Sequence, residues 1–216
     1  AGEGDDLVLY NKDGATEVAR FGLPRQADGD QKCIVDYILD ASLGPDRRDV
    51  IALQVVTMGQ NASDTARDWF GEDRYQDYLY LHGLGVEMAE AMAEYMHHKI
   101  RCWWGFGDNE NLDNEDRIAE RYQGIRPAAG YPCQPDHTEK DTLWKILDAE
   151  KSTGVQLTES RAMNPGSSVC GLYFSNPKAN YFNLGRINQD QVKDYAARKG
   201  WTVAEAEKWL RPNLAT

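Results

Sequence analysis

The pattern of apolar positions predicts strands toward both ends of the chain. Short runs rich in β-branched and aromatic residues, bounded by Gly, Pro, Asn or Asp, are typical of strands. A turn at Asp13-Gly14 separates the first two runs, Gly59 ends the third, and Asn176-Pro177 separates the last two. The predicted strands cover residues 6–11, 17–23, 49–58, 169–175 and 180–187.

Helical spacing of apolar residues occupies much of the remaining chain. The predicted helices cover residues 62–70, 75–103, 139–151, 189–199 and 203–210. Asn61 or Ser63 is expected to cap the first helix. Thr202, with Glu205 three positions later, is a capping-box start for the last one. Because strands and helices do not alternate as βαβ units, the pattern favours an α+β fold with a mostly antiparallel sheet flanked by helices.

Length and composition favour a single domain over residues 1–216. A chain of 216 residues with 41% hydrophobic content can bury a substantial core. Two domains are the less favoured alternative. The chain begins with Ala1 and not Met, so we expect a processed or excised part of something longer.

The net charge limits the partners that the chain can bind. A formal charge of −11 argues against a nucleic-acid or anionic membrane surface, and favours a protein partner or a cationic ligand. The longest apolar runs, such as residues 50–56, are too short to span a bilayer, and residues 1–10 lack the features of a signal peptide. We therefore expect a cytoplasmic protein.

The cysteines agree with a reducing compartment. Cys33, Cys102, Cys133 and Cys170 are far apart and form no C-x-x-C pair. This spacing gives little support to a zinc or iron–sulfur site. Free thiols are expected, and the sequence leaves a disulfide open.

Residues 126–140, RPAAGYPCQPDHTEK, predict a stiff loop that leads into a helix. Proline fixes φ and restricts the residue before it, so the loop is ordered before anything binds. Gly130 permits close approach of a ligand, and Arg126 offers a planar fork for a carboxylate or phosphate. The alternative is a rigid surface crossover without a ligand.

Long segments of the chain carry the signature of a known family. They read AEAMAEYMHHKIRCWWGF at 89–106, NENLDNEDRIAERYQGI at 109–125, RPAAGYPCQPDHTEK at 126–140, LTESRAMNPGSSVCGLYFSNPKANYF at 157–182 and QDQVKDYAARKGWTVAEAEKWLRPNL at 189–214. Together they resemble the S-adenosylmethionine-binding reactivation domain of cobalamin (vitamin B12)-dependent methionine synthase. Similarity fades to a shared pattern between about residues 5 and 59. The resemblance implies a single curved domain around a twisted antiparallel sheet.

The resemblance also implies a function. A domain of this family would bind S-adenosylmethionine and support the reductive methylation of Co(II) cobalamin to methylcobalamin, which reactivates a stalled methionine synthase. Two partners are implied. One is the cobalamin-binding module, to which cobalamin is mainly bound, and the other is a flavodoxin-type electron donor. The protein would position the sulfonium methyl in line with cobalt, without an acid, base or nucleophile of its own.

Site residues follow from the same resemblance. Arg126 would pair with the ligand carboxylate, and backbone groups of Ala128 and Gly130 would bond its amino and adenine edges. Tyr131 would face the corrin ring from the other side of the loop. The remaining implied contacts with the nucleoside come from Tyr181, Phe182 and Glu90. For Tyr131, the alternative is a buried core tyrosine.

The chain departs from the family pattern at several points. Ala129 replaces a proline, and Cys133-Gln134 replaces an Ala-Cys pair, so the loop could be slightly more flexible than usual. The family's N-terminal segment, which supplies an acidic pocket residue, is expected to be missing. No cobalamin-binding D-x-H-x-x-G motif occurs, so the chain is not expected to make methionine alone.

Two functional readings remain open, and the first is the primary one. The first is a module or subunit of 5-methyltetrahydrofolate–homocysteine methyltransferase. The second is a non-catalytic S-adenosylmethionine-binding interaction or sensor domain that docks on another corrinoid protein. The sequence does not separate them.

Three further patterns have plain alternatives. Gly83 and Gly85 could begin a dinucleotide loop, but the third glycine is missing, and an interruption or bend in a long helix is the better reading. Glu94-x-x-His97 has the spacing of paired metal ligands, but no second copy exists. The aromatic residues at 173–174 and 181–182 are, by pattern alone, more typical of core packing than of a ligand site.

Overall fold

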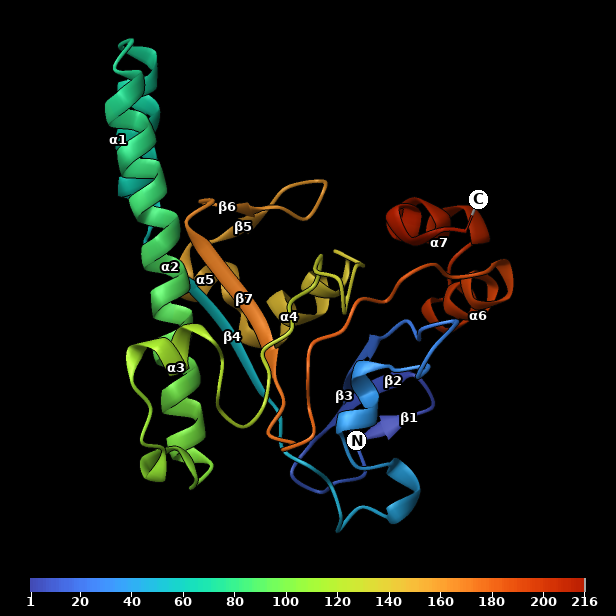
Figure 1. Cartoon of the computed structure of the whole chain (residues 1–216). Coiled ribbons are helices and arrows are strands. Elements are labelled where there is room, and N and C mark those ends of the chain that lie inside the picture. Colours follow the sequence, from blue (N-terminus) through green and yellow to red (C-terminus); the bar gives the residue numbers. More distant parts are fainter. Residues whose placement is uncertain (216) are drawn as a thin grey trace. The chain divides into compact units, whose positions relative to one another are not determined.

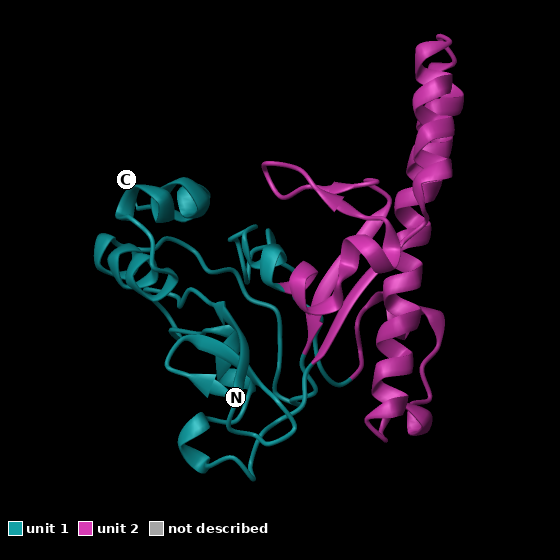
Figure 2. Ribbon diagram, turned by 180° about the vertical axis from the view of Figure 1, so that it is seen from behind, with its two compact units in different colours: residues 1–51, 123–142, 174–216 teal, residues 52–122, 143–173 magenta. Residues whose placement is uncertain are grey.

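The computed structural model describes residues 1–215, which group into two compact units. Unit 1 contains residues 1–51 and 123–142 and the chain from 174 onward, and unit 2 contains residues 52–122 and 143–173. Figure 2 colours the two units separately. The prediction of a single domain stays a prediction.

Unit 1 begins with a three-stranded antiparallel sheet of β1 (Gly2–Glu3), β2 (Asp6–Tyr10) and β3 (Glu17–Gly22). Leu7 pairs with Phe21 across β2 and β3, and both side chains are buried. The short 3-10 helices η1 (Ile34–Tyr37) and η2 (Ala41–Leu43) follow. This confirms the first two predicted strands and the turn between them.

The C-terminal helices of unit 1 form a small core of their own. α6 (Gln189–Lys199) and α7 (Val203–Leu210) pack together, and the 3-10 helix η4 (Arg211–Asn213) follows (Figure 1). The side chain of Asn188 caps α6 by accepting from the amides of Asp190 and Gln191. The buried residues of this core are Leu184, Ile187, Val192, Tyr195, Ala196, Ala206 and Leu210.

Unit 2 is built around one strand pair and one long helix. β4 (Ala52–Thr57) and β7 (Ser168–Tyr173) pair antiparallel, and α2 (Tyr75–Trp103) packs against both. α1 (Gln60–Gly71) runs beside the first part of α2 (Figure 1). The smaller elements are η3 (Gly107–Asn109), α3 (Asn114–Ile118), α5 (Ala149–Thr153), β5 (Gln156–Leu157) and β6 (Met163–Asn164).

The predicted interruption of α2 at Gly83 and Gly85 is wrong, because the helix runs unbroken for 29 residues. Its buried residues include Gly85, Ala89, Ala93 and His97, which recur on one face. A Cβ on Gly85 would lie 2.6 Å from Ser167 Oγ, so this glycine allows close packing and does not break the helix. Glycine costs about 1 kcal/mol in a helix, which packing of a long helix can offset.

Other boundaries differ from the predictions for local reasons. α1 starts two residues early, at Gln60, with Gly59 as its N-cap in place of Asn61 or Ser63. The helix expected over 139–151 is divided into α4 (Glu139–Leu147) and α5, because Asp148 adopts a left-handed conformation. α4 begins in unit 1 and ends in unit 2.

The strand predicted over 180–187 is wrong. This segment has no regular secondary structure apart from one isolated bridge between Ile187 and Leu214. Its backbone bonds to loops instead: the Leu184 amide donates to the Pro132 carbonyl at 3.0 Å. The α+β class with antiparallel strands is confirmed, with the strands of the described chain distributed over three small sheets.

Within residues 1–215, none of the helices combines the length and apolar character that crossing a bilayer requires.

Candidate functional site

Residues 126–138 form a tight loop in unit 1 that leads directly into α4. Its prolines restrict the backbone, and the chain also folds back on itself. The Gly130 amide donates to the Gln134 carbonyl at 2.7 Å, and the Gln134 amide donates to the Tyr131 carbonyl at 2.8 Å. The turn is therefore held by hydrogen bonds as well as by proline.

Arg126 stands at the start of this loop. Immediately before it, Ile125 and Phe174 exchange backbone hydrogen bonds of 3.1 and 2.9 Å, which fix the direction of the chain. The Arg126 amide then donates to the hydroxyl of Tyr181 at 3.0 Å, and Tyr181 is 43% exposed. The structure thus brings together two residues predicted for one site, although 55 positions separate them.

Cys133 ties the loop to the segment that carries Tyr181. Its thiol donates to the Phe182 carbonyl at 2.8 Å, and its sulfur accepts from the Phe182 amide at 3.1 Å. Burial raises the pKa of the Cys133 thiol, which keeps it protonated and able to donate. Phe182 is itself half-buried beside this contact. The cysteine that departs from the family pattern therefore has a structural task.

His137 supports the turn at Gly130. Gly130 has a φ of 101°, and a Cβ there would lie 2.4 Å from His137 Cε1. Burial, followed by the charge of Lys140, lowers the pKa of His137. The neutral ring can accept from the Lys140 ammonium, whose nitrogen is 2.9 Å from Nδ1. Nothing in the sequence pattern marked His137 for this role.

Two of the backbone groups expected to face a ligand are already engaged. The Ala128 carbonyl accepts from the Tyr131 amide at 3.2 Å, and the Gly130 amide bonds Gln134. This leaves the Ala128 amide and the Gly130 carbonyl as the candidates. Tyr131 is 61% exposed at the tip of the loop, so the alternative of a buried core tyrosine is wrong.

Of the remaining residues singled out in the sequence, Glu90 belongs to unit 2 and two aromatic residues lie in the core. Glu90 is exposed on α2, in unit 2, and its role stays a prediction. Tyr173 and Phe174 are completely buried, so for this pair the core reading holds.

The Glu94-x-x-His97 pair has structural partners in unit 2. The hydroxyl of Tyr122 donates to Glu94 at 2.8 Å. His97 is buried, with ring centroids 4.9 Å from Tyr122 and 4.8 Å from Tyr173. Across the part of the chain that the structure describes, no three His, Cys, Asp or Glu residues are grouped to hold a metal ion.

A buried ionic network lies where the loop ends and α4 begins. Tyr195 donates to Asp136 at 2.6 Å, and the Gly22 amide donates to Glu139 at 3.1 Å. Lys199 forms an ion pair with the same carboxylate of Glu139. Burial nevertheless raises the pKa of Glu139 to about 7, against the opposing effect of Lys199. The network joins the end of the loop to α6 and β3.

Replacing Glu139 with glutamine should reduce the pH dependence of stability. The folded-state pKa of about 7 exceeds the ordinary value of 4.5, so the folded protein binds this proton more tightly than the unfolded chain does. The stability that this provides is present at low pH and is lost as pH rises from about 4.5 to about 7. Glutamine does not titrate. Relative to the native protein, Glu139→Gln should therefore become steadily more stable across that window and level off above it.

Denaturant unfolding at closely spaced pH values measures this difference. Glu87→Gln, at an exposed position of α2, controls for the loss of one negative charge. A stability difference that stays constant, or that moves in favour of the native protein as pH rises, would contradict a raised pKa at Glu139.

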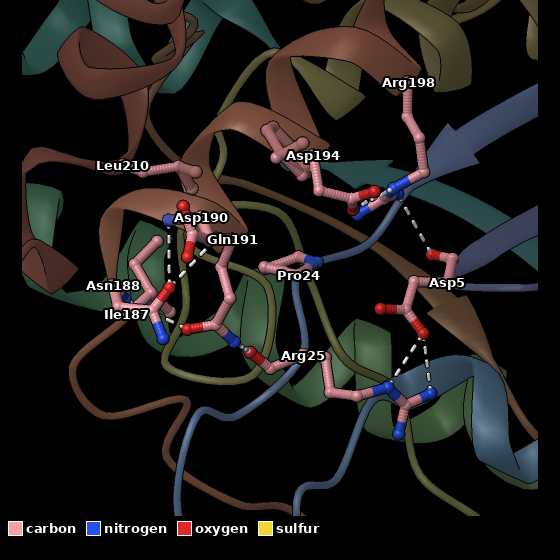
Figure 3. A pocket seen from close by; sticks show the side chains of 11 residues that line it. Asp5, Pro24, Arg25, Ile187, Asn188, Asp190, Gln191, Asp194, Arg198 and Leu210 are labelled. Carbon is pink, nitrogen blue, oxygen red and sulfur yellow. Dashed lines mark hydrogen bonds and ion pairs between the residues drawn. The ribbon is translucent and has the colours of Figure 1, made fainter.

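Unit 1 also contains a cavity of about 280 Å³ between the start of α6, Leu210 and the segment after β3 (Figure 3). Its polar groups are bonded to one another: Arg25 pairs with Asp5 at 2.7 Å and Arg198 with Asp194 at 2.8 Å. The Gln191 side chain completes the cap of α6. These contacts give the lining a structural role.

Comparison with known proteins identifies the family. The family model for the activation domain of vitamin B12-dependent methionine synthase matches residues 1–200. A crystal structure of the MetH reactivation domain bound to AdoHcy is similar to this chain, with a TM-score of 0.94 and 40% sequence identity. That similarity covers 100% of this chain and 67% of the other. The chain therefore belongs to the activation-domain family of vitamin B12-dependent methionine synthase.

Proposed function

We propose that this chain binds S-adenosylmethionine at the loop that begins with Arg126. The observation that carries the proposal is the hydrogen bond between the Arg126 backbone amide and the Tyr181 hydroxyl, which joins the backbone at the start of the loop to an aromatic side chain from a distant segment. A similar domain has been solved with AdoHcy, which is S-adenosylmethionine without its transferable methyl group. The same loop is the natural candidate here.

Each group in the proposed site matches part of the ligand. The Arg126 guanidinium can form a charge-assisted pair with the carboxylate. The Ala128 amide and Gly130 carbonyl can bond the polar edges of the ligand, and Tyr181 and Phe182 can pack on the nucleoside. The role of Glu90, on α2 in unit 2, rests on the family resemblance alone.

We assign a second role to Tyr131, which is exposed at the tip of a rigid turn. An exposed aromatic ring fits a flat, largely apolar macrocycle such as corrin. The methyl acceptor, cobalamin, would be carried mainly by a partner module and would receive an electron from a flavodoxin-type donor before it takes the methyl group. The loop would hold the sulfonium methyl in line with the acceptor, which is a matter of positioning.

In this account the chain acts as a module or subunit of 5-methyltetrahydrofolate–homocysteine methyltransferase. It would restore the enzyme from an oxidised cobalamin state and would not make methionine by itself. Its contribution to the methyl transfer would be to position the methyl donor against the acceptor.

Arg126→Ala tests the proposed ligand contact. The substitution should weaken S-adenosylmethionine binding by about 2 kcal/mol, because it removes a charge-assisted pair and leaves the ligand carboxylate without a partner. Calorimetry measures the affinity. Arg47→Ala, at an exposed position, is the control for loss of one positive charge. Unchanged affinity in Arg126→Ala would remove Arg126 from the site and weaken the family assignment of the loop.

A further inference from the structure

The end of α2 and the segment after it place a thiol, an imidazole, a carboxylate and a guanidinium in a row. Cys102 Sγ lies 3.6 Å from His98 Nε2, one turn earlier on the same helix. His98 Nδ1 lies 3.8 Å from a carboxylate oxygen of Glu110. Glu110 in turn accepts from Arg101 Nε, at 2.9 and 3.0 Å from its two oxygens. A base beside the sulfur is the usual arrangement around an activated thiol, and here a carboxylate lies on the other side of that base.

The far end of this row is rigid. Arg101 is completely buried, and its guanidinium lies 3.9 Å from the ring centroid of Tyr122. η3 packs against the end of α2 so closely that a Cβ on Gly107 would lie 2.5 Å from the Cys102 backbone nitrogen. Glu110 follows η3 immediately, so this packing holds its carboxylate near His98.

Cys102 differs from the other three cysteines in its surroundings. All four are free thiols, and Cys33, Cys133 and Cys170 are buried, whereas Cys102 is partly exposed. Burial raises the pKa of Cys33 to about 12, which leaves it unreactive at neutral pH. A reagent from solution should therefore reach Cys102 first.

We propose that Cys102 is a site of reversible thiol–disulfide exchange with small disulfides, and that His98 is its base. In this step the Cys102 proton moves to His98 Nε2, and the sulfur attacks one sulfur of the disulfide. A new S–S bond joins Cys102 to one half of the reagent, and the other half leaves as a thiolate that takes up the proton. One disulfide is broken and one is formed, so no further oxidant is needed.

Asp108 acts against this reaction. Its carboxylate accepts a hydrogen bond from the thiol and raises the pKa of Cys102, so the thiolate is disfavoured in the resting protein. The other charged groups acting on the sulfur are Lys99, which favours the thiolate, and Glu110, which opposes it. Arg101 adjoins Cys102 on α2, with its guanidinium directed to Glu110. Two different residues therefore act on the Cys102 thiol. His98 promotes its deprotonation, and Asp108 opposes it.

The experiment measures the reaction of the full chain with excess 4,4′-dithiodipyridine between pH 6 and 9, with the modified cysteine identified by peptide mass spectrometry. We expect one fast phase at Cys102 that disappears in Cys102→Ala. His98→Gln and His98→Asn should each slow this phase about tenfold at neutral pH and remove the part of the pH profile that depends on the imidazole. Asp108→Asn should accelerate it severalfold.

His82→Gln is the matched control, because His82 lies on the same helix and stacks on Tyr78, 5.6 Å between ring centroids. It should leave the rate unchanged. Thermal unfolding of each variant shows whether the helix end remains folded. Equal rates in the native protein and in a folded His98 variant would overturn the role of His98. A fast phase at another cysteine would overturn the site itself.

Discussion

Gly130→Ala is expected to weaken S-adenosylmethionine binding at least tenfold while the fold persists. Gly130 has a φ of 101°, where a side chain costs about 1–2 kcal/mol. The new Cβ would also lie 2.4 Å from His137 Cε1, so the ring must move and the turn with it. Because a factor of ten corresponds to about 1.4 kcal/mol, even a modest distortion of the turn reaches this size. Calorimetry with S-adenosylmethionine measures the loss.

Gly154→Ala separates this effect from general backbone strain. Gly154 also has a positive φ, of 74°, but a Cβ there would meet no atom within 4 Å. It should lower stability slightly and leave the affinity unchanged. If Gly130→Ala were folded and bound S-adenosylmethionine as tightly as the native protein, the turn would not be part of the site.

Tyr131→Ala is expected to lower the rate of reductive methylation at least tenfold while affinity for S-adenosylmethionine stays nearly constant. Tyr131 is 61% exposed, so its removal should cost little stability. In our account its ring fixes the corrin against the sulfonium methyl, and small misplacements are costly for an in-line transfer. The measurement compares methylation of a docked Co(II) cobalamin module with calorimetric affinity and with the melting temperature.

Tyr131→Phe keeps the ring and should retain most of the rate. Loss of binding and methylation together, with a lower melting temperature, would show instead that Tyr131 supports the loop. Unchanged melting, affinity and methylation in Tyr131→Ala would leave it an ordinary exposed residue.

The features that the sequence predicted correctly have local causes. The turn at Asp13-Gly14 and the start of α7 at Thr202, whose side chain accepts from the Glu205 amide, are set by neighbouring residues. The stiffness of the loop likewise follows from its own prolines. The adjacency of Arg126 and Tyr181 is different, because it was inferred from family resemblance and not from local pattern.

The features that were missed depend on contacts between distant segments. The segment at 180–187 has strand-like composition, but its backbone hydrogen bonds go to loop residues such as Pro132 and Cys133 and not to a strand ladder. His137 supports Gly130 only because the loop folds back. Gly85 looked like a helix breaker because the sequence does not reveal Ser167 on the other side.

The most direct test of the account combines this chain with a methionine synthase core stalled in the Co(II) state, a reductant and S-adenosylmethionine. We predict that methylcobalamin forms, and that its formation requires both the chain and S-adenosylmethionine. Docking of the chain without any methyl transfer would contradict the proposal and support a non-catalytic interaction or sensor domain.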